Sequence, residues 1–426
     1  MRRPYDLLAV VAIAIAITAG AAPASAEDIR WEFTAQVRPR FEIRDGYQRL
    51  HTKNEGPVSF FSQRTRLGVR CIASPQASAF VQLQDVRTWG EERGTSSDAA
   101  ADAFEAHQAY VDLRPLSCFM IRVGRQELSY DEERILGNSD WLQQGRAHDA
   151  VCLQWDHDVW AAHSAWAHNE SGELLSSRSY RPFGENYKDL VTMWVARQWT
   201  HGKGSLIFVY DRERPLLLAY TNRCTFGSRI ERAIHAFEFR LETYWQLGHL
   251  KTNSWYPTRS WNGTDTIWVS AFMVASRVSY DLGAATLALW YDYLSGNHSS
   301  WGTYRAFSTP YPSNHGFYGW ADYFLNIPQD NKQRGLQDLA LKGKLKNLGP
   351  ASGECHIHYF WYAQPDERGD KALGLEIDLG ASYPVTKGVT LQAGYAHVEP
   401  TDALKRLKGG ETAANWFYST LDFNVK

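Results

Sequence analysis

The sequence predicts an all-β protein, a transmembrane antiparallel β-barrel of about eighteen strands. Three observations predict this fold. Apolar and polar side chains alternate along many segments, these segments are about ten residues long, and short connections alternate with long ones. Because successive side chains of a strand point to opposite faces, a period of two marks a sheet with one apolar and one polar face. In a barrel, the apolar face contacts lipid and the polar face lines the lumen.

The alternation is clearest in residues 31–43. Trp31, Phe33, Ala35, Val37, Phe41 and Ile43 share one parity, and Glu32, Thr34, Gln36, Arg38, Arg40 and Glu42 share the other. The same pattern returns in 64–73, 236–245 and 373–380. It predicts strands at 30–45, 62–73, 77–88, 105–114, 118–127, 146–156, 158–169, 191–200, 204–212, 224–231, 235–247, 267–280, 283–295, 336–347, 353–364, 371–383, 388–399 and 413–425.

The connections favour a barrel over a soluble sandwich. Tight turns are predicted near 74–76, 114–116, 157–158, 201–203, 281–282 and 384–387, and longer loops at 46–61, 89–104, 128–145, 170–190, 248–266 and 296–335. Outer-membrane barrels place periplasmic turns on one rim and long extracellular loops on the other. An even strand count then puts both termini in the periplasm.

The N-terminal segment predicts export from the cytoplasm. Arg2 and Arg3 precede an apolar run from Leu7 to Thr18, and small residues end the segment at Ala26. This pattern is typical of a secretory signal peptide over 1–26. A membrane anchor is the alternative, but the apolar run is short for a span. Residues 27–426 show no linker and are predicted to form one barrel domain.

Composition argues against several other classes of protein. The chain has 45 Lys and Arg against 47 Asp and Glu, a balance that suggests no nucleic-acid partner. Its 5 cysteines are scattered and show no metal-ligand spacing, so we expect free thiols. His356 and His358 share a strand face and are a possible metal pair, but the sequence suggests no third ligand. We expect no metal and no cofactor.

The stretch 120–146, MIRVGRQELSYDEERILGNSDWLQQGR, begins as a strand and then becomes highly charged. Gly124 permits a bulge or a close backbone approach, after which Arg125 and Gln126 are expected to point inward. Residues 128–145 are predicted to form an extracellular loop. Arg146 and His148 lie on the polar parity of the following strand.

This stretch resembles the signature of the alginate-export family of outer-membrane barrels. The matching positions are Gly124, Arg125, Gln126, Glu133, Arg134, Gly137, Trp141 and Arg146 to Asp149, and RPRFEIR and SQRTRLGVR resemble the first two strands of the family. The resemblance covers nearly the whole mature chain. It implies an eighteen-stranded barrel in the Gram-negative outer membrane that passes an anionic polysaccharide, such as alginate or a similar uronate polymer, through a cationic lumen. Outer-membrane lipid, the barrel-assembly machinery and periplasmic export proteins are the expected partners.

The candidate site is therefore a set of inward charges along the substrate pathway. Parity indicates Arg38, Arg40, Arg64, Arg66, Arg70, Arg240, Lys342, Lys344 and Lys346, and the resemblance adds Arg125, Arg134 and Arg146. Guanidinium groups match carboxylates and stay charged at physiological pH. Glu127, Glu133 and Asp149 are expected to pair with the arginines and keep substrate binding weak. Alternatively, such charges only keep the lumen solvated or brace its wall.

One departure from the family concerns the plug of the pore. The resemblance implies an extended periplasmic turn as plug, whereas every predicted periplasmic turn here is short. The loop 296–335 is long and rich in Tyr, Trp, Gly and Asn. It either folds inward as a constriction, docks sugar rings on its aromatics, or covers the surface as a lid.

Other functions remain as alternatives. A passive anion-selective porin for small sugar acids or other organic acids needs the same cationic lumen as a polymer exporter. Enzymatic activity is not expected, because Asp131, Glu132 and Glu133 are consecutive and point in different directions, which does not suit paired catalytic carboxylates. No HExxH or GxSxG motif is present. A structural or adhesive role based on 296–335 is a third possibility.

Overall fold

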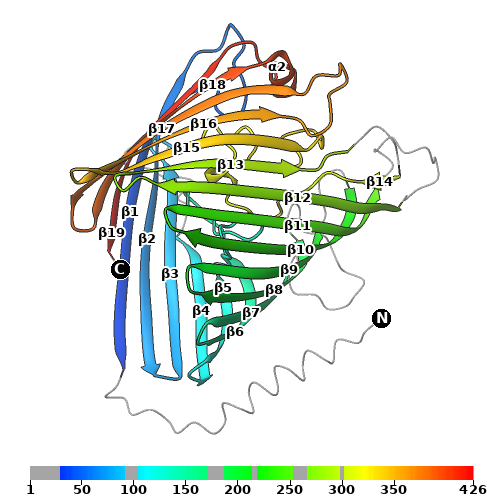
Figure 1. Ribbon diagram of the computed structural model, residues 1–426. Coiled ribbons are helices and arrows are strands. Elements are labelled where there is room, and N and C mark those ends of the chain that lie inside the picture. The colour runs from blue at the N-terminus through cyan, green and yellow to red at the C-terminus, as the bar shows by residue number, and fades with distance from the viewer. Residues whose placement is uncertain are drawn as a thin grey trace.

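The computed structural model describes residues 29–91, 104–169, 187–213, 218–252, 266–297 and 302–425. These residues form a closed antiparallel barrel of 18 strands (Figure 1). The barrel closes because β1 (Arg30–Asp45) pairs with β2 (Val58–Ser74) on one side and with β19 (Ala414–Val425) on the other. The predicted signal peptide, 1–26, lies outside the described residues.

All predicted strands are present. The remaining wall strands are β3 (Ala77–Thr88), β4 (Glu105–Leu116), β5 (Phe119–Gln126), β6 (His148–His157), β7 (Trp160–His168), β8 (Tyr187–Trp199), β9 (Gly202–Glu213), β10 (Leu218–Ile234), β11 (Phe237–Thr252), β12 (Thr266–Asp281), β13 (Ala285–Leu294), β15 (Leu336–Leu348), β16 (Ala351–Trp361), β17 (Ala372–Thr386) and β18 (Val389–Pro400). The two-residue β14 (Thr303–Tyr304) pairs in parallel with β12, while β13 pairs directly with β15.

The two rims differ as predicted. Short turns join β2 to β3, β4 to β5, β6 to β7 and the later pairs on one rim, and longer connections lie on the other. Both ends of the barrel chain lie on the short-turn rim, since Arg30 is opposite Ile72 and Val425 is opposite Ala35. The opposite rim carries the short helix α2 (Asp402–Lys408), capped by the Thr401 side chain. Among the described helices, none has the length and apolarity needed to cross a membrane.

The outer and inner faces of the wall have opposite character. Large apolar side chains face outward, among them Phe33 and Trp268, which are 69% and 67% exposed. The residues of opposite parity are buried and largely polar, including Arg38, Arg64 and Glu242. An apolar exterior is what lipid requires, and a polar interior keeps the lumen wet.

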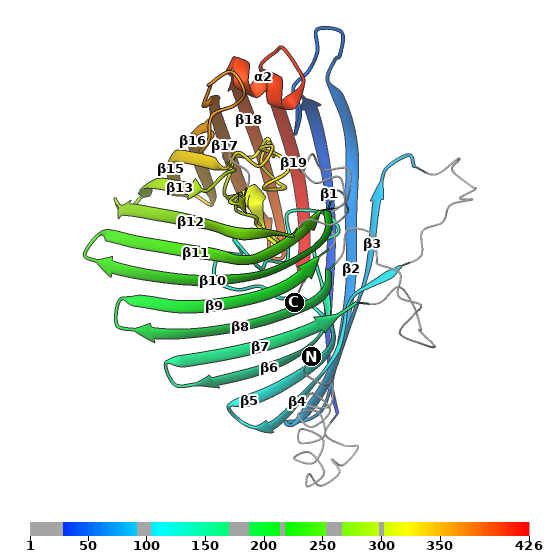
Figure 2. The ribbon, with the colours of Figure 1, turned by 90° about the vertical axis from the view of Figure 1, so that its right-hand side faces the viewer.

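The interior of the barrel is partly filled by two segments from the long-loop rim. We call residues 127–147 the first inward loop and residues 302–335 the second inward loop. Figure 2 shows the yellow second inward loop inside the ring of strands. Their apolar side chains form a core within the lumen, in which Leu136, Phe307 and Phe324 are buried. The long segment predicted at 296–335 therefore folds inward where it is described.

Candidate functional site

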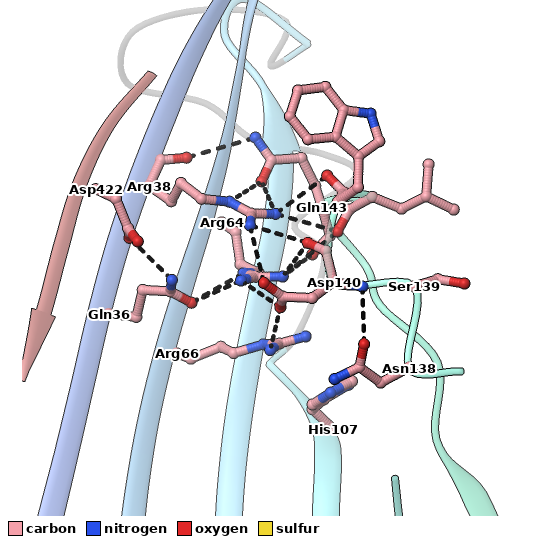
Figure 3. A network of polar contacts seen from close by, with 12 residues as sticks. Gln36, Arg38, Arg64, Arg66, His107, Asn138, Ser139, Asp140, Gln143 and Asp422 are labelled. Atoms are coloured by element: carbon pink, nitrogen blue, oxygen red, sulfur yellow. Dashed lines mark hydrogen bonds and ion pairs between the residues drawn. The ribbon is translucent and has the colours of Figure 1, made fainter. Parts of the chain in front are cut away.

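Arginines of β1 and β2 converge on one carboxylate of the first inward loop (Figure 3). Arg38 and Arg64 are directly opposite each other in the β1–β2 register, so their like charges need a nearby anion. Asp140 supplies it. Its Oδ1 lies 2.8 Å from Nη2 of Arg64 and 3.4 Å from Nη1 of Arg66, and its Oδ2 lies 3.4 Å from Nη1 of Arg38. The guanidinium groups in turn hold the pKa of Asp140 below its usual value, although burial acts to raise it.

These three arginines and Arg40, also on β1, donate to backbone carbonyls of the loop. Nη1 of Arg38 donates to the carbonyl of Asp140 at 2.9 Å, and Nη2 of Arg40 donates to the carbonyl of Trp141 at 2.8 Å. The guanidinium of Arg40 also lies 3.8 Å above the Trp141 ring, in cation–π geometry. In this conformation the four arginines hold the loop.

The opposite wall holds the loop in the same manner. Glu132 of the first inward loop lies among Arg229, Arg240 and Arg277, which project from β10, β11 and β12. Nη2 of Arg229 is 3.2 Å from a Glu132 oxygen, and Nη1 of Arg277 is 3.6 Å from the same oxygen. One loop therefore spans the lumen between two clusters of wall arginines.

Arg134 is the most deeply buried cation of this loop. Its Nη1 lies 2.5 Å from Asp292 of β13, and its Nε lies 3.3 Å from Glu242 of β11. Its guanidinium also lies 4.1 Å from the ring of Phe317 in the second inward loop. Burial alone would lower the pKa of Arg134, but Asp292 and Glu242 raise it above its usual value. Arg134 is therefore a fixed charge within the lumen.

The two inward loops are joined to each other. The Ser313 hydroxyl donates to Glu133, and Leu136 forms a parallel β-bridge with Tyr311. Nη1 of Arg146 donates to the carbonyl of Gly137 at 3.0 Å and to that of Pro312 at 2.9 Å. Burial lowers the pKa of Arg146 to about 10, so it remains charged at neutral pH.

The second inward loop docks on the wall through hydrogen bonds. The amide of Ala321 donates to Glu376 of β17 at 2.7 Å, and Nζ of Lys342 of β15 donates to the carbonyl of Gly316 at 3.3 Å. The Gln246 side chain of β11 donates to the carbonyl of Ser308 at 2.7 Å. The barrel wall thus fixes both loops across the bore.

A cavity of about 1510 Å³ remains between the loops and the wall. Charged side chains of both signs line it, including Arg146, Arg223, Glu132 and Asp140, together with the Trp290 ring. The lining therefore presents cationic and anionic groups side by side.

The structure places most of the predicted site residues inside the barrel, where they are buried or half-buried: Arg38, Arg40, Arg64, Arg66, Arg70, Glu127, Glu133, Arg134, Arg146, Arg240 and Lys342. Lys344 shares the inward parity of Lys342 but is exposed near the short-turn rim. Glu127 braces the first inward loop, since its carboxylate contacts Nε2 of His107 at 2.8 Å and accepts a hydrogen bond from the Asn138 amide at 3.0 Å. Burial acts to raise its pKa, but these hydrogen bonds hold the pKa of Glu127 below its usual value.

The inward placement of Arg125 and Asp149 is wrong. Arg125 is two residues after Val123, which is 45% exposed, and therefore shares its outward face. Asp149 lies opposite Arg125 on β6, and the two side chains form an ion pair of 3.2 Å. Gly124 has a positive φ of 129°, but the β5–β6 register continues through it without a shift. The strand keeps its parity, so this pair lies on the outside of the wall.

Several residues that organise the lumen were not among the predicted site residues. Arg223 and Arg229 have the parity opposite to Phe226 and Ile230, which are exposed. Alternation within 224–231 could therefore have identified Arg229 as inward. The role of Asp140 had no such signal, because its partner Arg64 is 76 residues away.

Comparisons with known proteins agree with this geometry. The structure is similar to OccK11 (OpdR) of Pseudomonas aeruginosa, with 14% identity and a TM-score of 0.59 over 96% of this chain and 99% of that chain. It is also similar to OccAB1 of Acinetobacter baumannii (12% identity, TM-score 0.62, 93% and 96% covered) and to a BenF-like porin of Pseudomonas fluorescens Pf-5 (10%, 0.60, 94% and 98%). At these identities the likeness concerns the fold. No curated protein matches the sequence.

The barrel fold, its polar lumen and the match to a family of exporters define an outer-membrane β-barrel channel of Gram-negative bacteria. The chain belongs to the alginate export family, whose model matches residues 30–419.

Proposed function

We propose that this channel passes solutes that carry carboxylates, and that uronates, as sugar acids or short oligomers, are the class that best suits its lumen. The observation that carries the proposal is the convergence of Arg38, Arg64 and Arg66 on the single carboxylate of Asp140. A uronate carboxylate has the charge and shape of the Asp140 side chain. It can therefore compete for the same guanidinium groups as it passes.

The size of the solute follows from the two inward loops. They are fixed to the wall on several sides and leave a chamber of about 1510 Å³, which suits a small ligand or a few sugar rings. Membership of the alginate export family favours a second candidate, an extended uronate polymer such as alginate. Passage of a polymer would require the first inward loop to leave the wall arginines.

The proposed orientation places the short-turn rim, and with it both ends of the barrel chain, in the periplasm. Support comes from the segregation of short turns to one rim and long connections to the other, which is the arrangement of outer-membrane barrels. The partners in this proposal are the uronate solute and outer-membrane lipid, with periplasmic export proteins required for the polymer.

Conductance of the purified barrel in planar bilayers tests the proposal. We expect anion selectivity and current block by mono- and oligo-uronates, but not by neutral dextrins of equal length. Uronates should block the current less in Arg64→Ala and equally well in the outward-facing control Arg125→Ala. This result would place the uronate-binding residues in the lumen. Block that deepens steadily with chain length favours the polymer candidate. Equal block by dextrins and uronates would overturn the proposal.

A further inference from the structure

A group of metal-binding side chains lies on the inner wall behind the second inward loop. His356 and His358 project inward from β16, since Ile357 and Tyr359 between and after them are exposed on the outside. On the neighbouring strand β17, Asp378 is directly opposite His356 in the register. One ligand atom from each of the three residues lies within 4.8 Å of the others. Asp378 therefore supplies the third candidate ligand, which the sequence alone did not indicate.

Each histidine has one ring nitrogen engaged by a carboxylate and the other left free. Nδ1 of His358 contacts Asp338 at 2.9 Å, while its Nε2 is buried without a hydrogen-bond partner among the described residues and lies 3.8 Å from Asp378. Nε2 of His356 lies 3.5 Å from Glu354, and its Nδ1 is likewise buried without such a partner. Metal-ligating histidines typically use a carboxylate in this way to fix the tautomer that presents the free nitrogen.

The surroundings hold three buried carboxyl groups. Asp338, Glu376 and Asp378 are all at most 3% exposed. Arg134 is occupied by Asp292 and Glu242, and Lys342 is a second described cation close to Asp338 and Asp378. The Lys342 ammonium has partners of its own, the carbonyl of Gly316 at 3.3 Å and the face of Trp290 at 4.3 Å. A divalent cation would give Asp378 a partner, since both of its carboxylate oxygens are buried without a hydrogen bond among the described residues.

We propose that His356, His358 and Asp378 bind a divalent transition-metal ion of the zinc class. Two imidazole nitrogens and one carboxylate are a ligand set that zinc accepts, and a water or Glu376 can supply the fourth position. Ligand atoms around zinc lie about 3.3 Å apart, so the side chains need to approach each other by up to about 1.5 Å. Imidazole ligands argue against Ca²⁺ and Mg²⁺, which prefer oxygen ligands.

The position of the site connects it to the lumen. The ring of Trp320 in the second inward loop packs edge-on against His356, with centroids 5.2 Å apart. Glu376, next to Asp378 on the same face of β17, accepts the hydrogen bond from the Ala321 amide of that loop. A metal ion here would therefore stiffen the part of the wall on which the second inward loop docks.

Metal binding to the full, tag-free barrel in detergent tests the site. After chelator treatment and removal of the chelator, we expect one Zn²⁺ to bind per chain, and Co²⁺ to give the intense visible absorption of a tetrahedral site. His358→Gln and Asp378→Asn should abolish both signals. Asp338→Asn should weaken binding about 10- to 100-fold, because it removes the partner that orients His358. His397→Gln, which alters a histidine of β18 that contacts Asn415, should bind as the wild type does.

Loss of folding must be separated from loss of the site. His356→Gln is the second variant for this purpose, because its side chain is 12% exposed and tolerates substitution better than the fully buried His358. Metal binding is compared only for variants whose heat-dependent gel mobility matches that of the wild-type barrel, because this mobility reports a folded barrel. Failure of the wild-type barrel to bind Zn²⁺ or Co²⁺, or undiminished binding by a folded His356→Gln barrel, would overturn the proposal.

Discussion

Asp140 of the first inward loop lies 2.8 Å from Arg64 on the inner wall. This contact ties a loop carboxylate to the centre of the β1–β2 arginine cluster. Arg64 is itself 1% exposed and also donates to Gln36 at 2.8 Å, so its position is fixed by the wall. Asp140, whose side chain is 53% exposed, is the more accessible partner of this pair.

Asp140→Asn should loosen the first inward loop and raise conductance. The Asp140 side chain is 53% exposed, so loss of its ion pairs is expected to cost only about 1–2 kcal/mol. A change of that size shifts the ratio of anchored to free loop by about 5- to 30-fold. Single-channel recordings should show a larger or more frequently open current. Asp366→Asn, which removes a carboxylate that Arg406 contacts on the long-loop rim, is the matched control and should leave the current unchanged.

Arg134→Met should destabilise the barrel strongly. The substitution leaves Asp292 and Glu242 buried without their shared cation, which typically costs about 3–5 kcal/mol. The temperature at which the folded band disappears in detergent gels should fall. The double variant Arg134→Met/Asp292→Asn should recover part of the loss, because it removes one unpaired charge. An unchanged transition in the single variant would contradict the role of Arg134 as a buried brace.

Gly319→Ala should displace the second inward loop from the wall. Gly319 has a φ of 80°, and a Cβ there would lie 2.3 Å from the Glu376 carboxylate. The backbone strain at position 319 and the steric contact with Glu376 are together expected to destabilise the docked loop by about 1–3 kcal/mol. Limited proteolysis of the loop should become faster. Gly316→Ala is the matched control, because a Cβ at that position meets nothing within 4 Å. Equal proteolysis rates in the two variants would refute the steric argument.

The first inward loop should stay anchored in mildly acidic solution. The pKa values of Asp140 and Glu127 are both below their usual values, so their ion pairs and hydrogen bonds stabilise the loop wherever the carboxylates are ionised. For a depressed pKa, this stabilisation is lost only as the pH falls through the folded-state value. Conductance should therefore be constant from neutral pH down to about pH 5 and change only below about pH 4. A transition near pH 6 would point to a histidine instead.

Alternation predicted the wall because each strand carries its pattern in its own residues. The strand at 30–45, for example, is recognisable from the parity of Trp31 and Phe33 alone, and its bounds agree with β1. Strands whose ends are polar were placed less well. β8 begins at Tyr187, whereas the pattern suggested 191, because Lys188 and Asp189 interrupt the apolar parity.

The candidate site was harder to predict because it depends on contacts between distant segments. Parity correctly predicted that Arg38, Arg64 and Arg240 point inward. It could not indicate that carboxylates of the first inward loop form ion pairs with them. For Arg125, the error came from treating Gly124 as a break. The β4–β5 register passes through Gly124 opposite Tyr110 without a shift, so the local sequence was compatible with two parities and only strand pairing distinguished them.

Leu136 and Tyr311 form a bridge between the two inward loops, and Arg146 bonds the same two loops together. This connection affects how the loops move when the channel opens and closes. Because the two inward loops are bonded to each other, neither can leave the lumen alone unless these bonds break first. Current through one barrel should therefore switch between two levels in an all-or-none fashion, with no intermediate step of half amplitude. Weakening this connection by Arg146→Gln should introduce that intermediate step.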